Sequence, residues 1–225
     1  MSILRKFADP ESADSWANRM RRRRFALFLK LLRQVPPPVR LLDVGGSERF
    51  WQLMPLGGVQ ELHITILNTA IFKPTVKNIT SVVGDARRLE GYGEGSFDVV
   101  FSNSVIEHLG TSEGQQQMSA AVRRVGRRYF IQTPNKCFPM EPHFLFPCFH
   151  FLPFRARVWI ASHYSVGWYC RPGDPEAATR EVQAIRLLGA KELMSLFPKA
   201  TLYRERVGGL TKSLMACGGW NPHTN

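Results

Sequence analysis

Polar side chains follow four predicted strands, each at the point where the strand ends. The first group lies in the stretch LLDVGGS, where Asp43 comes late in an apolar run and Gly45, Gly46 and Ser47 form a turn. Two glycines let a ligand approach the backbone without meeting a Cβ atom. Ser47 is suited to cap the short helix that follows. By itself, this motif is equally consistent with a ligand-binding loop and with a structural turn.

Three later strand ends carry polar groups as well. They are Asn68 after ITIL, Asp85 with Ala86 in VVGDARRL, and Asn103 with Ser104 after FDVVFS. In an open parallel sheet, ligands bind beyond the carboxyl ends of the strands. An amide at that edge can bond sugar hydroxyls, and a carboxylate can accept an adenine amino proton. Four polar strand ends in order therefore favour a nucleotide-like ligand over simple turns.

Three titratable side chains near these strand ends are candidates for proton transfer. His108 follows the fourth strand, and Glu141 and His143 stand in MEPHF just past the fifth. Histidine titrates near neutral pH, which suits a general base. A structural role stays open for each, as a cap, a packing group or a satisfied hydrogen bond. The set Glu141, His143, Cys148 and His150 fits no standard metal-ligand spacing, so we expect no metal site.

The elements that must position these residues alternate between strands and helices. Helices are predicted over residues 13–34, 47–54, 111–125, 174–188 and 190–197, and strands over 39–44, 61–67, 79–83, 97–103, 127–133, 200–207 and 212–218. Alternation of this kind predicts an α/β fold with a doubly wound, mostly parallel sheet.

Residues 137–160 interrupt the alternation with a stretch rich in proline and aromatic side chains. So many aromatic groups would be costly to leave exposed, so they form a lid, a dimer contact or a membrane-facing surface. A lid of this composition suggests an apolar or aromatic ligand. The aromatic residues are Phe138, Phe144, Phe146, Phe149, Phe151, Phe154 and Trp159.

The positive charge is concentrated near the N-terminus. The whole chain of 225 residues carries a net charge of +12, and residues 1–40 hold ten basic against three acidic side chains. The run Arg21–Arg24, with Arg155 and Arg157 beside the aromatic segment, suits an anionic group on a ligand or an anionic lipid surface. A solvated helix face is the open alternative for the arginine run.

The motifs LLDVGGS, GDARRL and FDVVFSNSVIEHL resemble those of the class I S-adenosylmethionine-dependent methyltransferases, in particular the ubiquinone/menaquinone-type branch. The likeness covers residues 39–135, and 186–217 resembles that family's closing helix and strand pair. It implies a seven-stranded Rossmann-like sheet with helices on both faces and S-adenosylmethionine as cofactor. The implied cofactor-binding residues are Asp43, Gly45, Gly46 and Ser47 in the glycine loop, Asn68 at the ribose, Asp85 and Ala86 at the adenine, and Asn103 and Ser104 beside the sulfonium.

Two positions depart from the family pattern. Ser47 stands where the family's loop usually has its second glycine, and Asn68 replaces the acid that usually holds the ribose diol. Asn68 keeps the hydrogen bonds but loses the charge. These departures leave open a non-catalytic relative that serves as a partner subunit.

The leading interpretation is a methyltransferase for an apolar, aromatic or lipid-linked small molecule. An RNA methyltransferase that uses the basic first helix is the alternative; nucleic acid is disfavoured because no N-P-P-Y-type motif or RNA-binding module is present. We expect one domain, with a basic helix and linker (1–38), a cofactor-binding core (39–135), an aromatic lid (136–173) and a C-terminal part (174–225). Cysteines without CxxC spacing and the lack of a long apolar run predict a cytoplasmic protein without a spanning helix. The aromatic segment and the arginines leave peripheral contact with anionic membrane open, and the oligomeric state, monomer or homodimer, stays open too.

Overall fold

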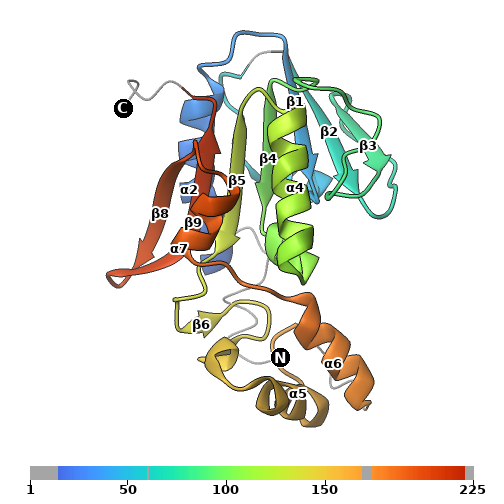
Figure 1. The fold of residues 1–225 in the computed structure, drawn as a ribbon. Coiled ribbons are helices and arrows are strands. Elements are labelled where there is room, and N and C mark those ends of the chain that lie inside the picture. Colours follow the sequence, from blue (N-terminus) through green and yellow to red (C-terminus); the bar gives the residue numbers. More distant parts are fainter. Residues whose placement is uncertain (1–14, 60, 169–173, 221–225) are drawn as a thin grey trace.

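The fold is built on one seven-stranded sheet in the order β3-β2-β1-β4-β5-β9-β8 (Figure 1). The computed structural model describes residues 15–59, 61–168 and 174–220. The first five strands are parallel, and β9 runs antiparallel to both β5 and β8. The strands are β1 (Val39–Val44), β2 (Leu62–Asn68), β3 (Ile79–Val83), β4 (Val99–Asn103), β5 (Tyr129–Pro134), β8 (Thr201–Val207) and β9 (Leu210–Gly218). The predicted mostly parallel sheet is confirmed.

Strand order reverses between β1 and β4, which are neighbours although two strands separate them in sequence. The chain leaves β1 toward β2 on one side and leaves β4 toward β5 on the other. The two loops therefore diverge and open a crevice at the carboxyl ends of these strands, where open α/β sheets bind ligands.

Helices cover both faces of the sheet, as expected from the alternation. In Figure 1, α4 (Ser112–Val125) and α7 (Ala190–Leu196) lie in front of the sheet and α2 (Trp16–Leu32) lies behind it. Side chains of β1 point alternately to the two sides: Leu41 joins the core under α2 and α3 (Glu48–Leu53), and Leu42 joins the core under α4. This alternation puts Asp43 on the α3 face.

Most helix starts follow from capping side chains. The hydroxyls of Ser15, Ser47 and Thr111 accept hydrogen bonds from the first turns of α2, α3 and α4, and Asp174 caps α6 (Pro175–Ala184). The prediction of helix through residue 188 was wrong. Ile185 is extended and packs with the aromatic segment, and Leu188 pairs with Asn135 and joins the core under α4, so the helix does not continue.

The aromatic segment folds as a small layer of its own beyond the end of β5. It contains β6 (Met140–Glu141), β7 (Phe146–Pro147), the 3₁₀ turn η2 (Phe149–Phe151) and α5 (Phe154–His163). Phe144 and Phe149 stack at 4.3 Å and pack with Val182 of α6 in a separate cluster. Figure 1 shows α5, α6 and β6 together below the sheet. No helix among the described residues is long and apolar enough to cross a membrane.

Candidate active site

A cavity of about 250 Å³ lies at the carboxyl ends of β1, β2 and β4. The glycine loop forms one side of it, Asn68 and Asn103 contribute from β2 and β4, and Arg21 of α2 borders it. Three of the four predicted strand ends therefore meet at this cavity, and their assignment to a cofactor stays a prediction. Of the predicted cofactor residues, the cavity is lined by Asp43, Gly45, Gly46, Ser47, Asn68 and Asn103.

Both glycines of the loop occupy positions that admit no side chain. Gly45 has φ +74°, and a Cβ there would stand 2.6 Å from the Cγ2 of Val105. A Cβ on Gly46 would stand 1.7 Å from Oδ2 of Asp43. The loop therefore passes close to β1 and to the turn after β4.

Asp43 is buried beneath this loop. Trp51 of α3 donates its indole N–H to Oδ2 at 2.7 Å, and Oδ1 has no hydrogen-bond partner among the described residues. Burial raises the pKa of Asp43 to about 7, although the Trp51 bond acts in the opposite direction. A cationic ligand group in the cavity would stabilise the ionised carboxylate.

This raised pKa predicts how stability changes with pH. Between the ordinary pKa of 3.8 and about 7, the folded state holds a proton that the unfolded state has lost. Stability contributed by this group is therefore lost as pH rises from 4 to 7. The variant Asp43→Asn removes the titration, and denaturant unfolding at pH 8 should show it more stable than the native chain, by a value on the order of 3 kcal/mol. Equal pH slopes for both proteins would contradict the assignment.

Asn68 and Ser47 serve the loop itself. The amide of Asn68 donates to the carbonyl of Gly46 at 3.0 Å, and its oxygen accepts from the backbone N–H of Thr69 at 2.8 Å. Ser47 caps α3, as its sequence position predicted. Asn68 stands where the methyltransferase-like motif usually has an acid, and its hydrogen bond to Gly46 holds the glycine loop against β2.

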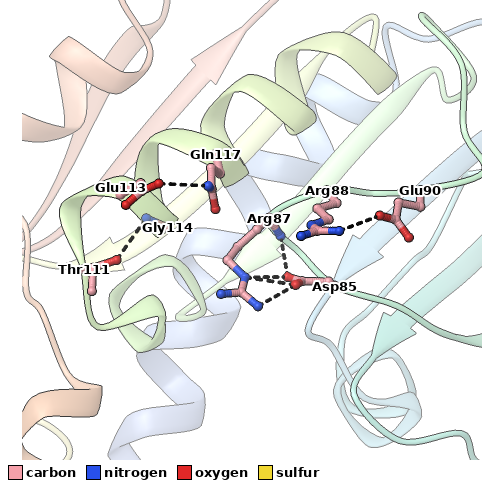
Figure 2. A network of polar contacts seen from close by, with 8 residues as sticks. All are labelled: Asp85, Arg87, Arg88, Glu90, Thr111, Glu113, Gly114 and Gln117. Atoms are coloured by element: carbon pink, nitrogen blue, oxygen red, sulfur yellow. Dashed lines mark hydrogen bonds and ion pairs between the residues drawn. The ribbon is translucent and has the colours of Figure 1, made fainter.

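Asp85 lies apart from these groups. Its carboxylate accepts from the guanidinium of Arg87 at 2.7 to 3.0 Å, as Figure 2 shows, and it does not line the cavity. The hydrogen bond from Arg87 holds the pKa of Asp85 below its usual range. Ala86 packs against the core beneath α4. An adenine contact through the Asp85 side chain would have to displace Arg87.

A second cavity, of about 420 Å³, adjoins the first, and Arg21 borders both. Ser104 lies in its wall, with φ +58° and its hydroxyl donating to Oε1 of Gln132 at 2.9 Å. Most of the exposed lining is apolar. The large apolar side chains around it are Trp16, Phe138, Met140, Leu145 and Trp168.

Cations border this second cavity on one side. They are Arg21, Arg24 and Lys212. Arg24 is buried and pairs with Glu205 at 2.8 Å, and Lys212 lies 4.4 Å from the ring of Trp16. Burial lowers the pKa of Lys212 to about 8, with the charge of Arg24 adding to the effect. Arg21 and Arg24 of the arginine run therefore border the cavities, whereas Arg22 and Arg23 lie on an exposed face of the helix.

The predicted acid–base residues lie together beside the second cavity, and His143 lines it. Nδ1 of His143 is hydrogen-bonded to Oε1 of Glu141 at 2.7 Å, and the ring of His108 meets that of His143 edge-on at 4.7 Å. The buried Oε2 of Glu141 accepts from the backbone N–H of Phe144 at 2.6 Å. The fold thus brings His108 beside two residues that lie 33 and 35 positions later in the chain.

Glu107 completes this cluster, although sequence reasoning did not select it. It is fully buried on η1 (Ile106–Leu109), where Oε2 accepts from the hydroxyl of Thr133 at 3.0 Å and Oε1 lies 3.9 Å from Nε2 of His143. Its position beside His108 after the fourth strand was the available signal. Trp51, which holds Asp43, carried no comparable signal because aromatic residues at helix starts are usually core.

Burial and mutual charge perturb the titration of the cluster. Burial raises the pKa of Glu107 to about 7. Desolvation of the His108 ring, with the charge of His143 adding to it, lowers the pKa of His108 to about 4, although the residue keeps contact with solvent. Burial also opposes the charged form of His143, but the hydrogen bond and charge of Glu141 outweigh it and raise the pKa of His143.

Known proteins are similar to this chain over the stretch that contains the glycine loop. Residues 44–128 match the family model described as a methyltransferase domain. Two curated proteins of Mycobacterium tuberculosis, the uncharacterized proteins Rv1509 and MT1557, are each 28% identical over 102 residues, which is 45% of this chain and 32% of theirs. The chain therefore matches about a third of the length of these relatives.

Solved structures share the architecture at low sequence identity. The PH0226 protein from Pyrococcus horikoshii OT3 has a TM-score of 0.55 at 16% identity, covering 98% of this chain and 96% of that one. The Burkholderia thailandensis 1,6-didemethyltoxoflavin-N1-methyltransferase, solved with 1,6-didemethyltoxoflavin and S-adenosylhomocysteine bound, has a TM-score of 0.53 at 16% identity, covering 91% and 80%. Residues 44–128 thus match a methyltransferase domain, and the fold around them is similar to that of a solved methyltransferase with bound S-adenosylhomocysteine. The matched model is the general one and does not single out the ubiquinone/menaquinone-type branch.

Proposed function

We propose that this chain transfers the methyl group of S-adenosylmethionine to a small molecule with an apolar or aromatic body. The observation that carries the proposal is the pair of adjoining cavities, one at the glycine loop and one lined by aromatic side chains, with Arg21 bordering both. A methyl donor in the first cavity would direct its sulfonium toward Asn103 and Ser104, where the second cavity begins.

Asp43 and the loop glycines are suited to the donor's charge and shape. S-adenosylmethionine carries an ammonium and a sulfonium cation, and Asp43 has a buried oxygen without a partner among the described residues. Gly45 and Gly46 allow the ligand to approach the backbone. We assign Asp43, Gly45, Gly46 and Asn103 to the donor; Asn68 supports the loop.

Methyl transfer is an in-line displacement in which the acceptor atom bonds to the methyl carbon as the carbon–sulfur bond breaks and sulfur keeps the electron pair. The protein therefore mainly aligns the two reactants and excludes water. His143, oriented by Glu141 and flanked by His108, lies where an acceptor in the aromatic cavity would lose its proton. We assign the acceptor's proton transfer to this group of residues.

Arg21 and Lys212 favour an acceptor that also carries an anionic group. Both border the aromatic cavity, so an acceptor that fills it would place one end near positive charge. A cavity with aromatic walls and basic side chains at its border fits an aromatic acid or a lipid-linked phosphate. Both acceptors carry an anionic group.

The proposal is tested in two measurements. Calorimetry with S-adenosylmethionine and with S-adenosylhomocysteine should show one site per chain. Incubation with trideuteromethyl-labelled donor and separate polar, lipid and RNA extracts should then label a small molecule or lipid. Absence of donor binding would overturn the enzyme assignment in favour of a partner subunit, and label found in RNA would overturn the acceptor class.

We extend the proposal to peripheral contact with anionic membrane through the aromatic layer. Five large side chains between residues 151 and 168 are exposed, with Trp159 at 54% and Tyr164 at 57%, and Arg155 stands among them on α5. Aromatic and basic side chains together are typical of interfacial binding. The five are Phe151, Phe154, Trp159, Tyr164 and Trp168.

The variant Trp159→Asp should therefore bind vesicles of mixed phosphatidylcholine and phosphatidylglycerol at least fivefold more weakly than the native chain in a sedimentation assay. Leu210→Asp is the matched control, because Leu210 is equally exposed, at 53%, but lies on the β8–β9 hairpin. Equal binding by native and Trp159→Asp proteins would remove the membrane contact from the proposal.

A further inference from the structure

Three side chains at the end of the aromatic cavity form a cluster of metal-ligand type. Glu107, His108 and His143 each offer one ligand atom, and these three atoms lie within 4.8 Å of one another. Glu107 and His108 come from η1 after β4, and His143 comes from the turn between β6 and β7. The sequence predicted no metal, because His143 was considered as a ligand only together with Glu141, Cys148 and His150, whose spacing fits no standard pattern.

The buried carboxylate of Glu107 lacks a partner for one of its oxygens. Oε2 accepts the Thr133 hydroxyl, but Oε1 has no hydrogen-bond partner among the described residues and lies 3.9 Å from Nε2 of His143. A buried carboxylate oxygen left without a partner is costly. A cation between Glu107 and His143 would remove that cost.

His143 is already oriented as a metal-bound histidine would be. Its Nδ1 is fixed by Oε1 of Glu141 at 2.7 Å, so Nε2 is the nitrogen that lies nearest Glu107. Glu141 is itself held by the backbone N–H of Phe144. A carboxylate behind a histidine is the usual second partner of a metal-ligating imidazole, because it fixes the ring and its tautomer.

We propose that Glu107, His108 and His143 bind one divalent transition-metal ion at the end of the aromatic cavity. Two imidazoles and one carboxylate suit Zn²⁺, Co²⁺ or Fe²⁺ and leave coordination positions open. Ligand atoms around zinc lie roughly 3.3 Å apart at bond lengths of about 2.0 Å, so the cluster must contract by about 1 Å. His108 is exposed and can rotate to supply most of that movement.

The role of the ion, unlike its binding, rests on the proposed methyl transfer. An acceptor hydroxyl in an open position would lose its proton to solvent more readily, because coordination lowers its pKa. Nε2 of His143 would then be a ligand rather than the proton acceptor. The acceptor oxygen would then bond to the methyl carbon as the carbon–sulfur bond breaks, and sulfur would keep the electron pair.

Binding is tested on the full chain after dialysis against a chelator. Titration with Co²⁺ should saturate at one ion per chain and give a visible d–d absorption without a thiolate charge-transfer band, since the proposed site contains no cysteine. Zn²⁺ should displace the cobalt. His143→Ala, Glu107→Gln and His108→Ala should each weaken Co²⁺ binding at least tenfold, whereas His63→Ala, an exposed histidine on β2, should leave it unchanged.

Several outcomes would overturn the proposal. They are absence of binding, a thiolate band from Cys137 or Cys148, or an affinity that the three substitutions do not change. Glu107 is buried, so thermal unfolding must show whether the Glu107→Gln variant is folded. If it is not folded, His108→Ala still tests the site, because His108 is exposed. Calorimetry with S-adenosylmethionine on the same samples separates the two proposals. Loss of metal binding with normal donor binding would overturn only the metal site, and loss of donor binding with normal metal binding would overturn only the proposed function.

Discussion

Replacing Gly46 with alanine should abolish binding of S-adenosylmethionine, with an affinity loss of at least 100-fold by calorimetry. The new Cβ would stand 1.7 Å from Oδ2 and 2.2 Å from Cγ of Asp43. The carboxylate would have to leave its position and break its 2.7 Å bond with Trp51. The loop and the buried anion that we assign to the donor would therefore both be displaced.

The matched control is Gly57→Ala, because a Cβ at Gly57 meets no atom within 4 Å. This variant should bind the donor as the native chain does. The double variant Asp43→Ala/Gly46→Ala tests for a general folding defect, because it lacks the carboxylate that the new Cβ would meet. Its thermal midpoint should equal that of Asp43→Ala. Donor affinity of Gly46→Ala within threefold of native would show that the cofactor site lies elsewhere.

Replacing His143 with alanine should reduce kcat by roughly 10²- to 10⁴-fold, the usual contribution of a positioned acid–base group, and the loss is expected as well if the ring acts as a ligand of the proposed ion. Donor affinity should stay unchanged, since His143 lines the aromatic cavity and not the cavity at the glycine loop. Glu141→Gln should lose about tenfold, because it weakens the orientation of the ring without removing it. The measurement is conversion of labelled donor with the acceptor found in the extract experiment.

Two further observations separate catalysis from packing. Added imidazole should restore part of the His143→Ala activity, which a merely structural loss would not allow. His63→Ala should have native kcat, because His63 lies near the amino end of β2, away from the site. Native turnover by His143→Ala would leave the methyl transfer in place but remove His143 from it.

Much of the fold could be predicted because its signals are local. Short apolar runs specify β1 and β3 to the residue, and hydroxyl caps at Ser47 and Thr111 set the starts of α3 and α4. The end of α6 could not be predicted from local pattern. Residues 185–188 have an apolar helical pattern, yet tertiary packing makes them extended.

The candidate site was predicted in part for the same reason. Gly45, Gly46 and Asn103 lie where their strand ends place them, since topology alone brings parallel strand ends together. The pairing of Asp85 with Arg87 and the use of Asn68 to hold the loop depend on side-chain geometry, which residue type does not specify.

Local sequence patterns were sufficient to predict which segments are strands, which residues end them, and which motif resembles that of a methyltransferase domain. Only the tertiary structure decided that Glu107, His108, Glu141 and His143 form one cluster at the wall of an aromatic cavity. Glu107 and His108 lie on η1, whereas Glu141 and His143 lie at and after β6. The distances of 2.7 to 4.8 Å that join them exist only after the sheet and the aromatic layer have packed together.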